Sequence, residues 1–263
     1  MEIQNSNIDG GQPFDWGRTS EDYAKFRDIY PPIFYRKITS RGLCVAPQRV
    51  LDLGTGTGVL PRNLYAHGAR WTGTDLSDNQ IAQAKRLSAQ AGMDISYFAC
   101  GAEELAFPDE SFDVITACQC FWYFNHEVLM PKLARFLTPG GRVVILYMAW
   151  LPDEDEIAGR SEDLVLRYNP AWTGAGETRH PIFIPDAALR DFRLAEHEEF
   201  DLRVPFTRET WHGRMKACRG VGASLPEPEL AAWEQEHIAL LQSIAPAQFH
   251  VLHYGAIAVL EKK

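Results

Sequence analysis

Along the first 150 residues, short apolar runs that are typical of strands alternate with stretches in which apolar residues are spaced as in a helix. Short apolar runs such as RVLDLG (49–54) and FDVITA (112–117) predict buried strands, whereas the spacing of apolar residues across 77–92 predicts a helix. Strands that alternate with helices form a parallel sheet that is covered on both faces. Because crossover connections are right-handed, this pattern predicts a doubly wound α/β fold.

After Trp150 the alternation stops. Residues 151–168 have helical spacing, and a stretch rich in proline and glycine follows them. Residues 193–206 and 249–262 predict two further strands, with two helices between them. We therefore expect a mostly parallel, seven-stranded sheet with a helical arm at the N-terminus and a helical lid inserted before the last strand.

The pattern divides the chain into three predicted parts. Residues 1–45 form a polar arm and short helices, residues 46–150 form the core of the sheet, and residues 151–263 supply the lid and the last strands. Within the first part, TSEDYAKFRDIY (19–30) has the composition of an amphipathic helix that ends before Pro31. A chain of this length needs neither a disulfide nor a metal to stabilise its fold.

Composition narrows the class of protein. A hydrophobic fraction of 46% and a charged fraction of 23% are typical of a globular chain. The net charge of −9 argues against a nucleic-acid or anionic membrane partner. The sequence has no apolar run long enough to span a bilayer, and its N-terminus lacks the charged and apolar regions of a signal peptide. We expect a cytoplasmic protein that does not bind membranes.

The cysteines favour a reducing compartment. They are five, an odd number, and they are scattered along the chain. Cys118 and Cys120 follow a predicted strand and share one face of it, because positions two apart point to the same side. Their C-x-C spacing differs from redox and zinc motifs, so we expect small apolar packing and no metal site.

The strongest chemical signal is LDLGTGTGVL (51–60), in which a strand leads through a glycine-rich loop into a helix. Glycines let the backbone turn tightly and let a ligand approach where a Cβ would collide. The spacing of Gly54, Gly56 and Gly58 is tighter than the spacing in dinucleotide-binding enzymes. No Gly-Lys-Ser/Thr follows, which excludes a phosphate-binding P-loop.

Two acidic residues lie close to this loop in the predicted fold. Asp52 precedes the glycines, where its charge repels a pyrophosphate and attracts a cation. Asp75 ends the next predicted strand, a position suited to accepting hydrogen bonds from ribose hydroxyls. The loop and the two carboxylates together predict a site for a nucleoside ligand that carries positive charge.

These residues resemble the class I S-adenosylmethionine-dependent methyltransferases. LDLGTGTG (51–58) is similar to the family's first motif, and TGTDLS (72–77) is similar to its second. EELAFPDESFDVI (103–115) and LTPGGRVVIL (137–146) resemble the later motifs in the same order. The resemblance covers residues 46–150 and implies a Rossmann-like methyltransferase fold with S-adenosyl-L-methionine as cofactor.

The resemblance also implies roles for individual residues. Residues 54–56 would approach the methionine moiety, Asp75 would hold the ribose hydroxyls, and Leu76 would pack on the adenine. Residues 102–103 would meet the adenine edge, and residues 118–119 would line the methyl region. The expected cofactor-binding residues are Asp52, Gly54, Thr55, Gly56, Gly58, Asp75, Leu76, Ala102, Glu103, Cys118 and Gln119.

One position departs from the family pattern. Many relatives have an aspartate where this chain has Gly101. The contact with the adenine amino group is then left to Glu103 or to backbone groups.

Aromatic residues mark the expected acceptor side. Phe121–Phe124 is a run of four aromatic residues that cannot all face one core, so at least one of them is expected to face the ligand. The resemblance implies that Gln119 and Trp122 face the methyl group and that Tyr23 closes over the cofactor. These three are the candidate catalytic residues, and they would act by positioning.

Other polar residues have two interpretations each. His126 precedes a predicted helix, where a capping or surface role is more common than a role as base. Arg179 and His180 lie in a long loop, and such loops are often functional. Arg214 and Arg219 share a predicted helix, where they either bind an anionic acceptor or form a solvated face.

The sequence thus predicts an enzyme that transfers a methyl group from S-adenosylmethionine to an O, N or S atom of a small molecule by in-line displacement. FTRETWHGRMKACRG (206–220) resembles the branch that includes trans-aconitate methyltransferases. The alternatives are an RNA or protein methyltransferase, a metalloid (arsenite-type) methyltransferase, and a non-catalytic cofactor-binding protein. The acceptor, the use of a general base and the oligomeric state stay open.

Overall fold

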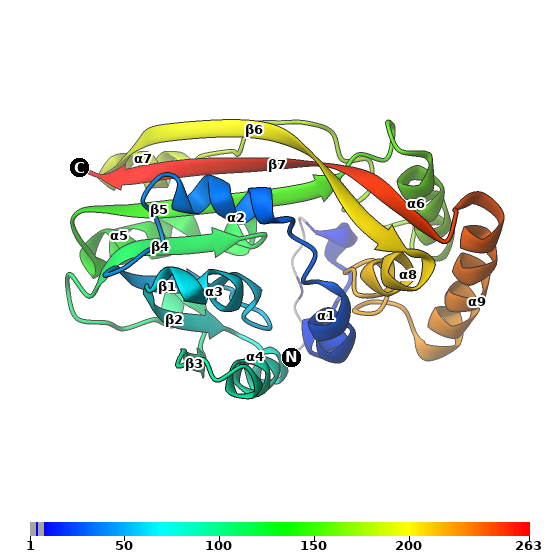
Figure 1. Cartoon of the computed structure of the whole chain (residues 1–263), viewed down its shortest axis with the longest axis horizontal. Helices are drawn as coiled ribbons and strands as arrows, with labels where there is room; N and C mark the ends of the chain where they lie inside the picture. The colour runs from blue at the N-terminus through cyan, green and yellow to red at the C-terminus, as the bar shows by residue number, and fades with distance from the viewer. Residues whose placement is uncertain (1–3, 5–7) are drawn as a thin grey trace. The chain divides into compact units, whose positions relative to one another are not determined.

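The computed structural model describes Gln4 and residues 8–263, apart from the side chains of Trp16 and Tyr23. The strands are β1 (Arg49–Leu53), β2 (Arg70–Asp75), β3 (Ser96–Ala99), β4 (Phe112–Cys118), β5 (Leu137–Trp150), β6 (Phe192–Thr207) and β7 (Gln248–Lys262). They form one seven-stranded sheet in the order β3-β2-β1-β4-β5-β7-β6 (Figure 1). The predicted seven-stranded sheet is confirmed.

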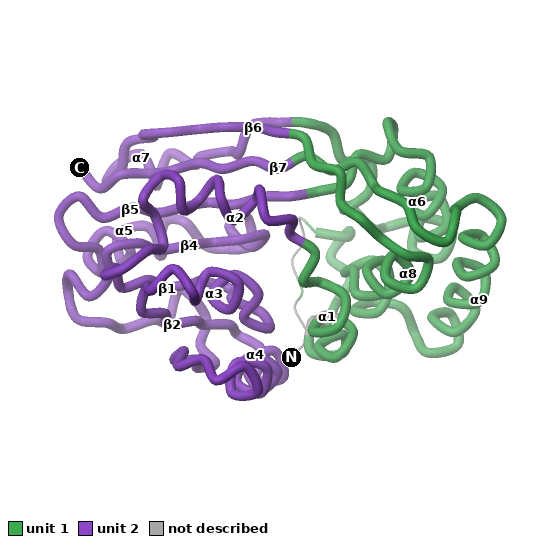
Figure 2. Tube along the Cα trace, viewed as in Figure 1, with its two compact units in different colours: residues 1–29, 149–179, 201–254 green, residues 30–148, 180–200, 255–263 purple. Residues whose placement is uncertain are grey.

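The chain folds into two compact units, which Figure 2 shows in different colours. Unit 1 contains residues 1–29, 149–179 and 201–254, and unit 2 contains residues 30–148, 180–200 and 255–263. The long strands β5, β6 and β7 contribute residues to both units. Neither unit is therefore one continuous stretch of chain.

The parallel part of the sheet lies in unit 2. β1 pairs in parallel with β2 and with β4, and β3 and β5 extend the parallel arrangement on either side. In this register Asp52 lies opposite Gly73 of β2 and Thr116 of β4. Residues 50–53 are buried, as expected for a central strand that is covered on both faces.

The last strand makes the sheet mixed. In Figure 1 the arrow of β7 points opposite to that of β5, its neighbour in the sheet. β6 lies at the edge of the sheet beside β7, as expected from a closing pair of strands. The prediction of a mostly parallel sheet is thus confirmed.

Helices of unit 2 cover both faces of its sheet. In Figure 1, α2 and α3 lie in front of the strands, and α5 and α7 lie behind them. These helices of unit 2 are α2 (Pro32–Thr39), α3 (Val59–Leu64), α4 (Asp78–Gln90), α5 (His126–Phe136) and α7 (Asp186–Asp191). α4 begins after Ser77, whose side chain accepts a hydrogen bond from the Gln80 amide and so caps the helix. The inward side of α4 packs Ile81 and Ala84 against Tyr97 of β3.

A larger core lies between the sheet and α5. Leu129, Leu133 and Phe136 of α5 pack with Ile115 of β4 and Val143 of β5. Each of these side chains is almost fully removed from solvent, which stabilises the fold by roughly 1.5–3 kcal/mol per large apolar side chain. This core fixes the positions of β4 and β5, and therefore the positions of the loops that follow them.

Unit 1 is mainly helical. Its helices are α1 (Ser20–Phe26), α6 (Glu156–Tyr168), α8 (Arg208–Lys216) and α9 (Glu227–Ile244). α6 starts later than the predicted helix over 151–168, because Asp155 caps it by accepting a hydrogen bond from the Ala158 amide. The start of the chain is bound to this unit through Asp9, which pairs with Arg219 at 2.7 Å.

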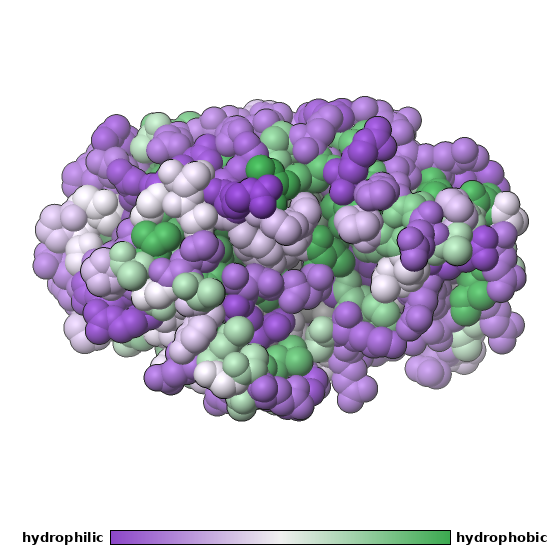
Figure 3. Space-filling view, viewed as in Figure 1, coloured by the Kyte–Doolittle hydropathy of each residue, from purple (hydrophilic) through white to green (hydrophobic). Residues whose placement is uncertain are grey.

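Polar residues cover much of the face viewed in Figure 3, and apolar residues gather there in separate groups. Across Gln4 and residues 8–263, we find no helix with both the length and the apolar character needed to cross a bilayer.

A pair of histidines, His212 and the buried His237, joins three helices of unit 1. Ser161 Oγ donates to the Ile157 carbonyl (2.7 Å). The same oxygen therefore accepts from Trp211 Nε1 (2.9 Å) and from His237 Nε2 (3.1 Å). With its proton on Nε2, His237 accepts at Nδ1 from His212 Nδ1, which lies 2.9 Å away. This chain of hydrogen bonds is complete only when the His237 imidazole is neutral, because His237 accepts at Nδ1.

Burial favours the neutral form of these histidines. It lowers the pKa of His237 to about 3, and the neighbouring His212 lowers it further. Burial also lowers the pKa of His212, against the opposite effect of Glu234. Another buried histidine of the unit, His253, has its pKa lowered to about 3 by burial as well.

We expect the free energy of unfolding to decrease as the pH falls below about 6.5, because the unfolded chain takes up protons that the folded chain excludes. Each of His237 and His253 accounts for a loss of about 2 kcal/mol between about pH 6.5 and about pH 5. His237→Asn removes one of these losses, whereas His250→Asn, at an exposed position of the same unit, retains both. Urea denaturation of the three proteins at both pH values measures the difference. An identical pH dependence in all three would contradict the assignment.

Candidate functional site

The carboxyl ends of β1, β2 and β4 meet at one edge of unit 2. Because these strands are parallel and adjacent, the segments that follow them lie side by side. These segments are the glycine loop (54–58), residues 75–77 and residues 118–121. The predicted motif residues are therefore brought together at this edge.

The glycine loop depends on backbone angles that favour glycine. Gly54, Gly56 and Gly58 have φ values of 57°, 56° and 76°, all in the left-handed region. A Cβ at Gly54 would lie 2.8 Å from Cys120 Sγ, and a Cβ at Gly58 would lie 2.4 Å from the Tyr97 hydroxyl. The loop is therefore packed closely on the side that faces the protein, which leaves bare backbone for a ligand.

Asp75 connects the end of β2 to the glycine loop. Its Oδ2 accepts a hydrogen bond from the Gly56 amide (3.0 Å), and its Oδ1 accepts one from the Ser77 amide (2.9 Å). Burial raises the pKa of Asp75, and the two amides oppose this effect. Each carboxylate oxygen has a second lone pair, so the same group can accept further hydrogen bonds from a ligand.

Asp52 lies beneath the loop with only 2% of its surface exposed. Its Oδ2 accepts from the Thr55 hydroxyl and its Oδ1 accepts from the Thr116 hydroxyl, both at 2.6 Å. Burial raises the pKa of Asp52 to about 6; the two hydroxyls oppose this shift, and the charge of Asp75 adds to it. A cation bound nearby would stabilise the ionised form of this carboxylate.

The residues expected at the adenine differ in their exposure to solvent and in their hydrogen bonds. Leu76 directly follows Asp75 and is 42% exposed, whereas Ala102 is buried. The Glu103 carboxylate accepts from the Asn125 amide (2.6 Å), so its side chain is engaged at the start of α5. At Gly101 an added Cβ would meet its nearest neighbour, the Glu104 side chain, at 3.8 Å, so space does not require a glycine there.

The segment after β4 holds the residues expected near the methyl group. Gln119 has a positive φ of 65°, and its backbone amide donates to the Leu146 carbonyl (2.9 Å). Its side-chain amide donates to the Met148 carbonyl of β5. Cys118 Sγ donates to the Tyr30 hydroxyl at 3.5 Å. This contact joins residues that are 88 positions apart in the sequence, so it does not follow from a local pattern.

The four aromatic residues after β4 divide between core and surface. Phe121 is buried and Phe124 is partly buried against the same core, whereas Trp122 is 45% exposed. The Trp122 ring meets the ring of Tyr147 edge-on, with centroids 5.0 Å apart. Sequence reasoning missed Tyr147, because it lies within an apolar strand. Tyr23, the third candidate catalytic residue, has a side chain outside the described residues.

The remaining polar candidates have partners in the structure. His126 Nε2 lies 2.9 Å from the Phe121 carbonyl. In unit 1, Arg179 pairs with Asp201, and Arg219 pairs with Asp9. Arg214 is buried over the Trp150 ring at 4.7 Å, so it does not form a solvated face.

Cys120 packs against the glycine loop and forms a hydrogen bond to the backbone. Cys120 Sγ donates to the Leu53 carbonyl at 3.1 Å and lies against Gly54. Burial raises the pKa of the Cys120 thiol well above its usual value, and Asp52 adds to this effect. Within the described part of the chain, no three His, Cys, Asp or Glu side chains are grouped to hold a metal ion.

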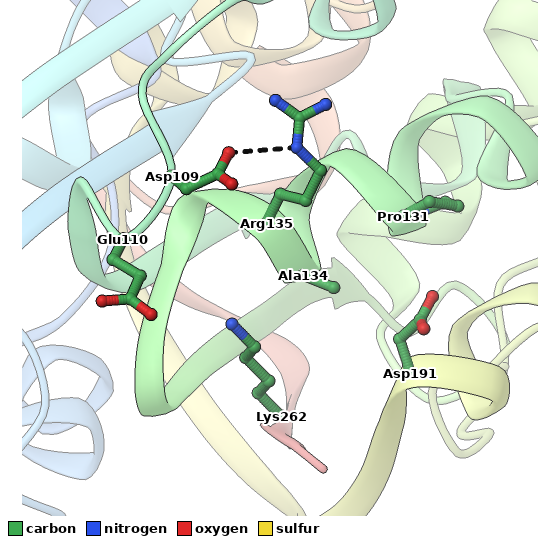
Figure 4. A pocket seen from close by; sticks show the side chains of 7 residues that line it. All are labelled: Asp109, Glu110, Pro131, Ala134, Arg135, Asp191 and Lys262. Atoms are coloured by element: carbon green, nitrogen blue, oxygen red, sulfur yellow. Dashed lines mark hydrogen bonds and ion pairs between the residues drawn. The ribbon is translucent and has the colours of Figure 1, made fainter.

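A separate pocket of 430 Å³ lies in unit 2 beside residues that directly precede β4 and β5. It is therefore at the amino ends of these strands, away from the glycine loop. Figure 4 shows Lys262 directed into this pocket and Arg135 bound to Asp109, a pair joined at 3.1 Å. Its lining residues are Asp109, Glu110, Pro131, Ala134, Arg135, Asp191 and Lys262.

The core of unit 2 is similar to a known family of proteins. Residues 51–145 match the family model described as a methyltransferase domain. This segment of the chain is therefore similar to methyltransferase domains. The matched segment runs from the middle of β1 to β5 and contains the glycine loop, Asp52 and Asp75.

Curated relatives resemble this methyltransferase domain. A demethylmenaquinone methyltransferase of Thermus thermophilus is 38% identical over 114 residues, which are 42% of this chain and 52% of that protein. A ubiquinone biosynthesis O-methyltransferase of Dechloromonas aromatica is 29% identical over 161 residues, which are 60% of this chain and 68% of that protein. The chain thus spans about half to two thirds of the length of these relatives.

Solved structures share the fold. One is phosphoethanolamine N-methyltransferase 2 of Haemonchus contortus, in complex with phosphomonomethylethanolamine and S-adenosylhomocysteine. Its TM-score is 0.55 at 20% identity, and the match covers 93% of this chain and 57% of that one. This similarity extends the methyltransferase fold beyond the matched domain.

We expect Gly54→Ala to destabilise the methyltransferase domain more than Gly92→Ala. Both substitutions place a side chain at a positive φ, 57° and 65°, which costs about 1 kcal/mol. Only at Gly54 does the new Cβ also collide with Cys120, and such overpacking adds about 1–3 kcal/mol. Urea denaturation of both variants measures the two effects. Equal losses of stability would show that the loop does not pack on Cys120.

Proposed function

We propose that this protein transfers the methyl group of S-adenosylmethionine to an O, N or S atom of a small molecule by in-line displacement. The observation that carries the proposal is the glycine loop held between the carboxylates of Asp52 and Asp75 at the carboxyl edge of parallel strands. This arrangement suits a ligand that combines a ribose with a positively charged group. The match of residues 51–145 to methyltransferases supports the same cofactor.

The residues at this edge fit the cofactor by the chemistry of their donors and acceptors. Asp75 offers carboxylate oxygens to ribose hydroxyls, and Asp52 offers negative charge to the cation. The bare backbone of residues 54–56 allows close approach of the methionine moiety. When bound, S-adenosylmethionine would supply a methyl group on a cationic sulfur; the acceptor lone pair would form the new bond while the C–S electron pair returns to sulfur, and any proton that the acceptor carries would pass to a base or to water.

The chain's own contribution is placement and the exclusion of water. Gln119 is fixed by its bonds to the backbone of β5, and Trp122 presents a partly exposed ring that contacts Tyr147 of the same strand. Holding reactants in line is worth up to about 7–11 kcal/mol of the barrier, so no covalent intermediate is required. We propose that Tyr23 and residues 1–45 close over the cofactor and that the helices within 151–263 act as a lid.

A small-molecule acceptor is favoured over the alternatives. The net charge of −9 argues against RNA. The raised pKa of Cys120 and its hydrogen bond to Leu53 argue against a thiolate site for a metalloid. The names of the relatives, a demethylmenaquinone methyltransferase and a ubiquinone biosynthesis O-methyltransferase, support a small acceptor. We also propose a cytoplasmic location, which the five free cysteines support.

Two measurements test the proposed function. Calorimetry with S-adenosylmethionine and S-adenosylhomocysteine is expected to show binding of both, and no binding of either would end the proposal. Incubation with labelled methyl donor and separate panels of thiols, amines, phenols and carboxylates is expected to give a labelled small molecule. Label transferred only to RNA or to protein would contradict the small-molecule acceptor, and binding without transfer to any acceptor would favour a non-catalytic protein.

Asp75→Ala should weaken the affinity for S-adenosylmethionine by about tenfold or more, because the ribose hydroxyls lose a charged hydrogen-bond acceptor. The substitution also removes the bonds to Gly56 and Ser77, so the melting temperature is measured alongside the dissociation constant. Asp94→Ala, which removes an exposed carboxylate of the same unit, is the matched control. An unchanged dissociation constant in Asp75→Ala would show that this residue does not hold the ribose.

Affinity for S-adenosylmethionine should fall as the pH decreases through about 6, because the cation favours ionised Asp52 and binding must then displace its proton. The dissociation constant at about pH 5 is expected to be about tenfold higher than at about pH 7.5. Asp52→Asn, which has no proton to lose, is expected to bind more weakly but with a flatter pH profile. The same steep profile in this variant would assign the titration to another group.

A further inference from the structure

Three ring side chains from separate segments form a row in unit 2. Trp122 follows β4, Tyr147 lies in β5, and His180 lies in the loop before α7. The centroids of Trp122 and Tyr147 are 5.0 Å apart at an interplanar angle of 84°, and those of Tyr147 and His180 are 5.6 Å apart at 39°. We call these residues the Tyr147 row, because Tyr147 is the ring that contacts both others.

The order of strands places this row next to the proposed methyl site. Along the carboxyl edge the order is β2 with Asp75, β1 with the glycine loop, β4 with Gln119, and then β5 with Tyr147. Gln119 bonds to the carbonyls of Leu146 and Met148, the two residues that flank Tyr147. The row therefore lies on the side of Gln119 away from Asp75, where an acceptor is needed.

The exposure of the row points to a ligand. Trp122 keeps 45% of its surface exposed, and His180 is also exposed. An apolar ring that stays in water loses the free energy that burial would supply, so a partly exposed tryptophan beside a reaction site is suited to covering by a ligand. Rings at these separations adopt edge-to-face and tilted contacts, and a further ring extends the same pattern.

We propose that the Tyr147 row is the acceptor subsite, that it takes the planar ring of an aromatic acceptor such as a phenol, and that Tyr147 determines this specificity. The proposal rests on the proposed function and names its substrate class. Trp122 and Tyr147 offer π faces and edges, which an aromatic ring uses and a saturated ring does not. Neither Trp122 nor Tyr147 carries the fixed positive charge with which an arginine or a lysine would bind a carboxylate acceptor.

The experiment compares an aromatic diol with a saturated ring diol and adds a cationic probe. Calorimetry is carried out on the full chain saturated with S-adenosylhomocysteine, using catechol, cyclohexane-1,2-diol and choline as probes. Catechol is expected to bind at least about tenfold more tightly than the diol, since only the former gains ring contacts. Tyr147→Ala is expected to reduce this ratio to about threefold or less, whereas Tyr147→Phe, which keeps the ring, retains it.

Further variants keep the result interpretable. Trp122→Ala removes a half-exposed ring and tests the row even where Tyr147→Ala fails to fold, and it should reduce the ratio in the same way. Phe183→Ala removes a ring that is 78% exposed in the same loop as His180, and it should leave the ratio unchanged. An altered ratio in Phe183→Ala would mean that the row is not specific.

The outcomes separate this inference from the proposed function. Equal binding of catechol and the diol, tighter binding of choline than of catechol, or a ratio that survives both Tyr147→Ala and Trp122→Ala would overturn the aromatic subsite. In each of these cases bound S-adenosylhomocysteine leaves the methyltransferase proposal standing. Failure of the native chain to bind S-adenosylhomocysteine would instead overturn the proposed function itself.

Discussion

The candidate site depends on the hydrogen bonds that hold a carboxylate inside the sheet. Asp52 is tolerated at a buried position because hydroxyls of Thr55 and Thr116 reach its two oxygens. Thr116 is available only because β4 pairs with β1 in the register that sets it opposite Asp52. The same pairing brings the segments after the strands to one edge. The charge of the site and the position of its loops therefore have a common origin.

Much of this arrangement follows from local sequence. Alternating strand and helix patterns predict the parallel sheet, since each element must bury one face against the next. The glycine loop is also predictable, because a positive φ favours glycine at residues 54, 56 and 58 and close packing adds to this at 54 and 58. Asp52 and Asp75 are identified by their places at the ends of predicted strands. These features need only short stretches of chain to specify them.

Contacts between segments that are distant in the sequence cannot be predicted from local sequence patterns. Tyr147 occupies an apolar strand, and nothing in that pattern shows that its ring meets Trp122 and His180. Likewise the pairing of Asp9 with Arg219 joins residues that are 210 positions apart in the sequence within unit 1. Such contacts depend on how far each long strand extends and on where the neighbouring strands end. They appear only when the whole chain is folded.

The contact between Gly54 and Cys120 has a consequence for variation among related sequences. The thiol occupies the space that a Cβ on residue 54 would need, and it also bonds the carbonyl of Leu53. The two positions thus share one small volume although they belong to different loops. A lineage that enlarges residue 54 must shrink or reorient residue 120, so a substitution of this glycine is expected to arise together with a compensating one at position 120.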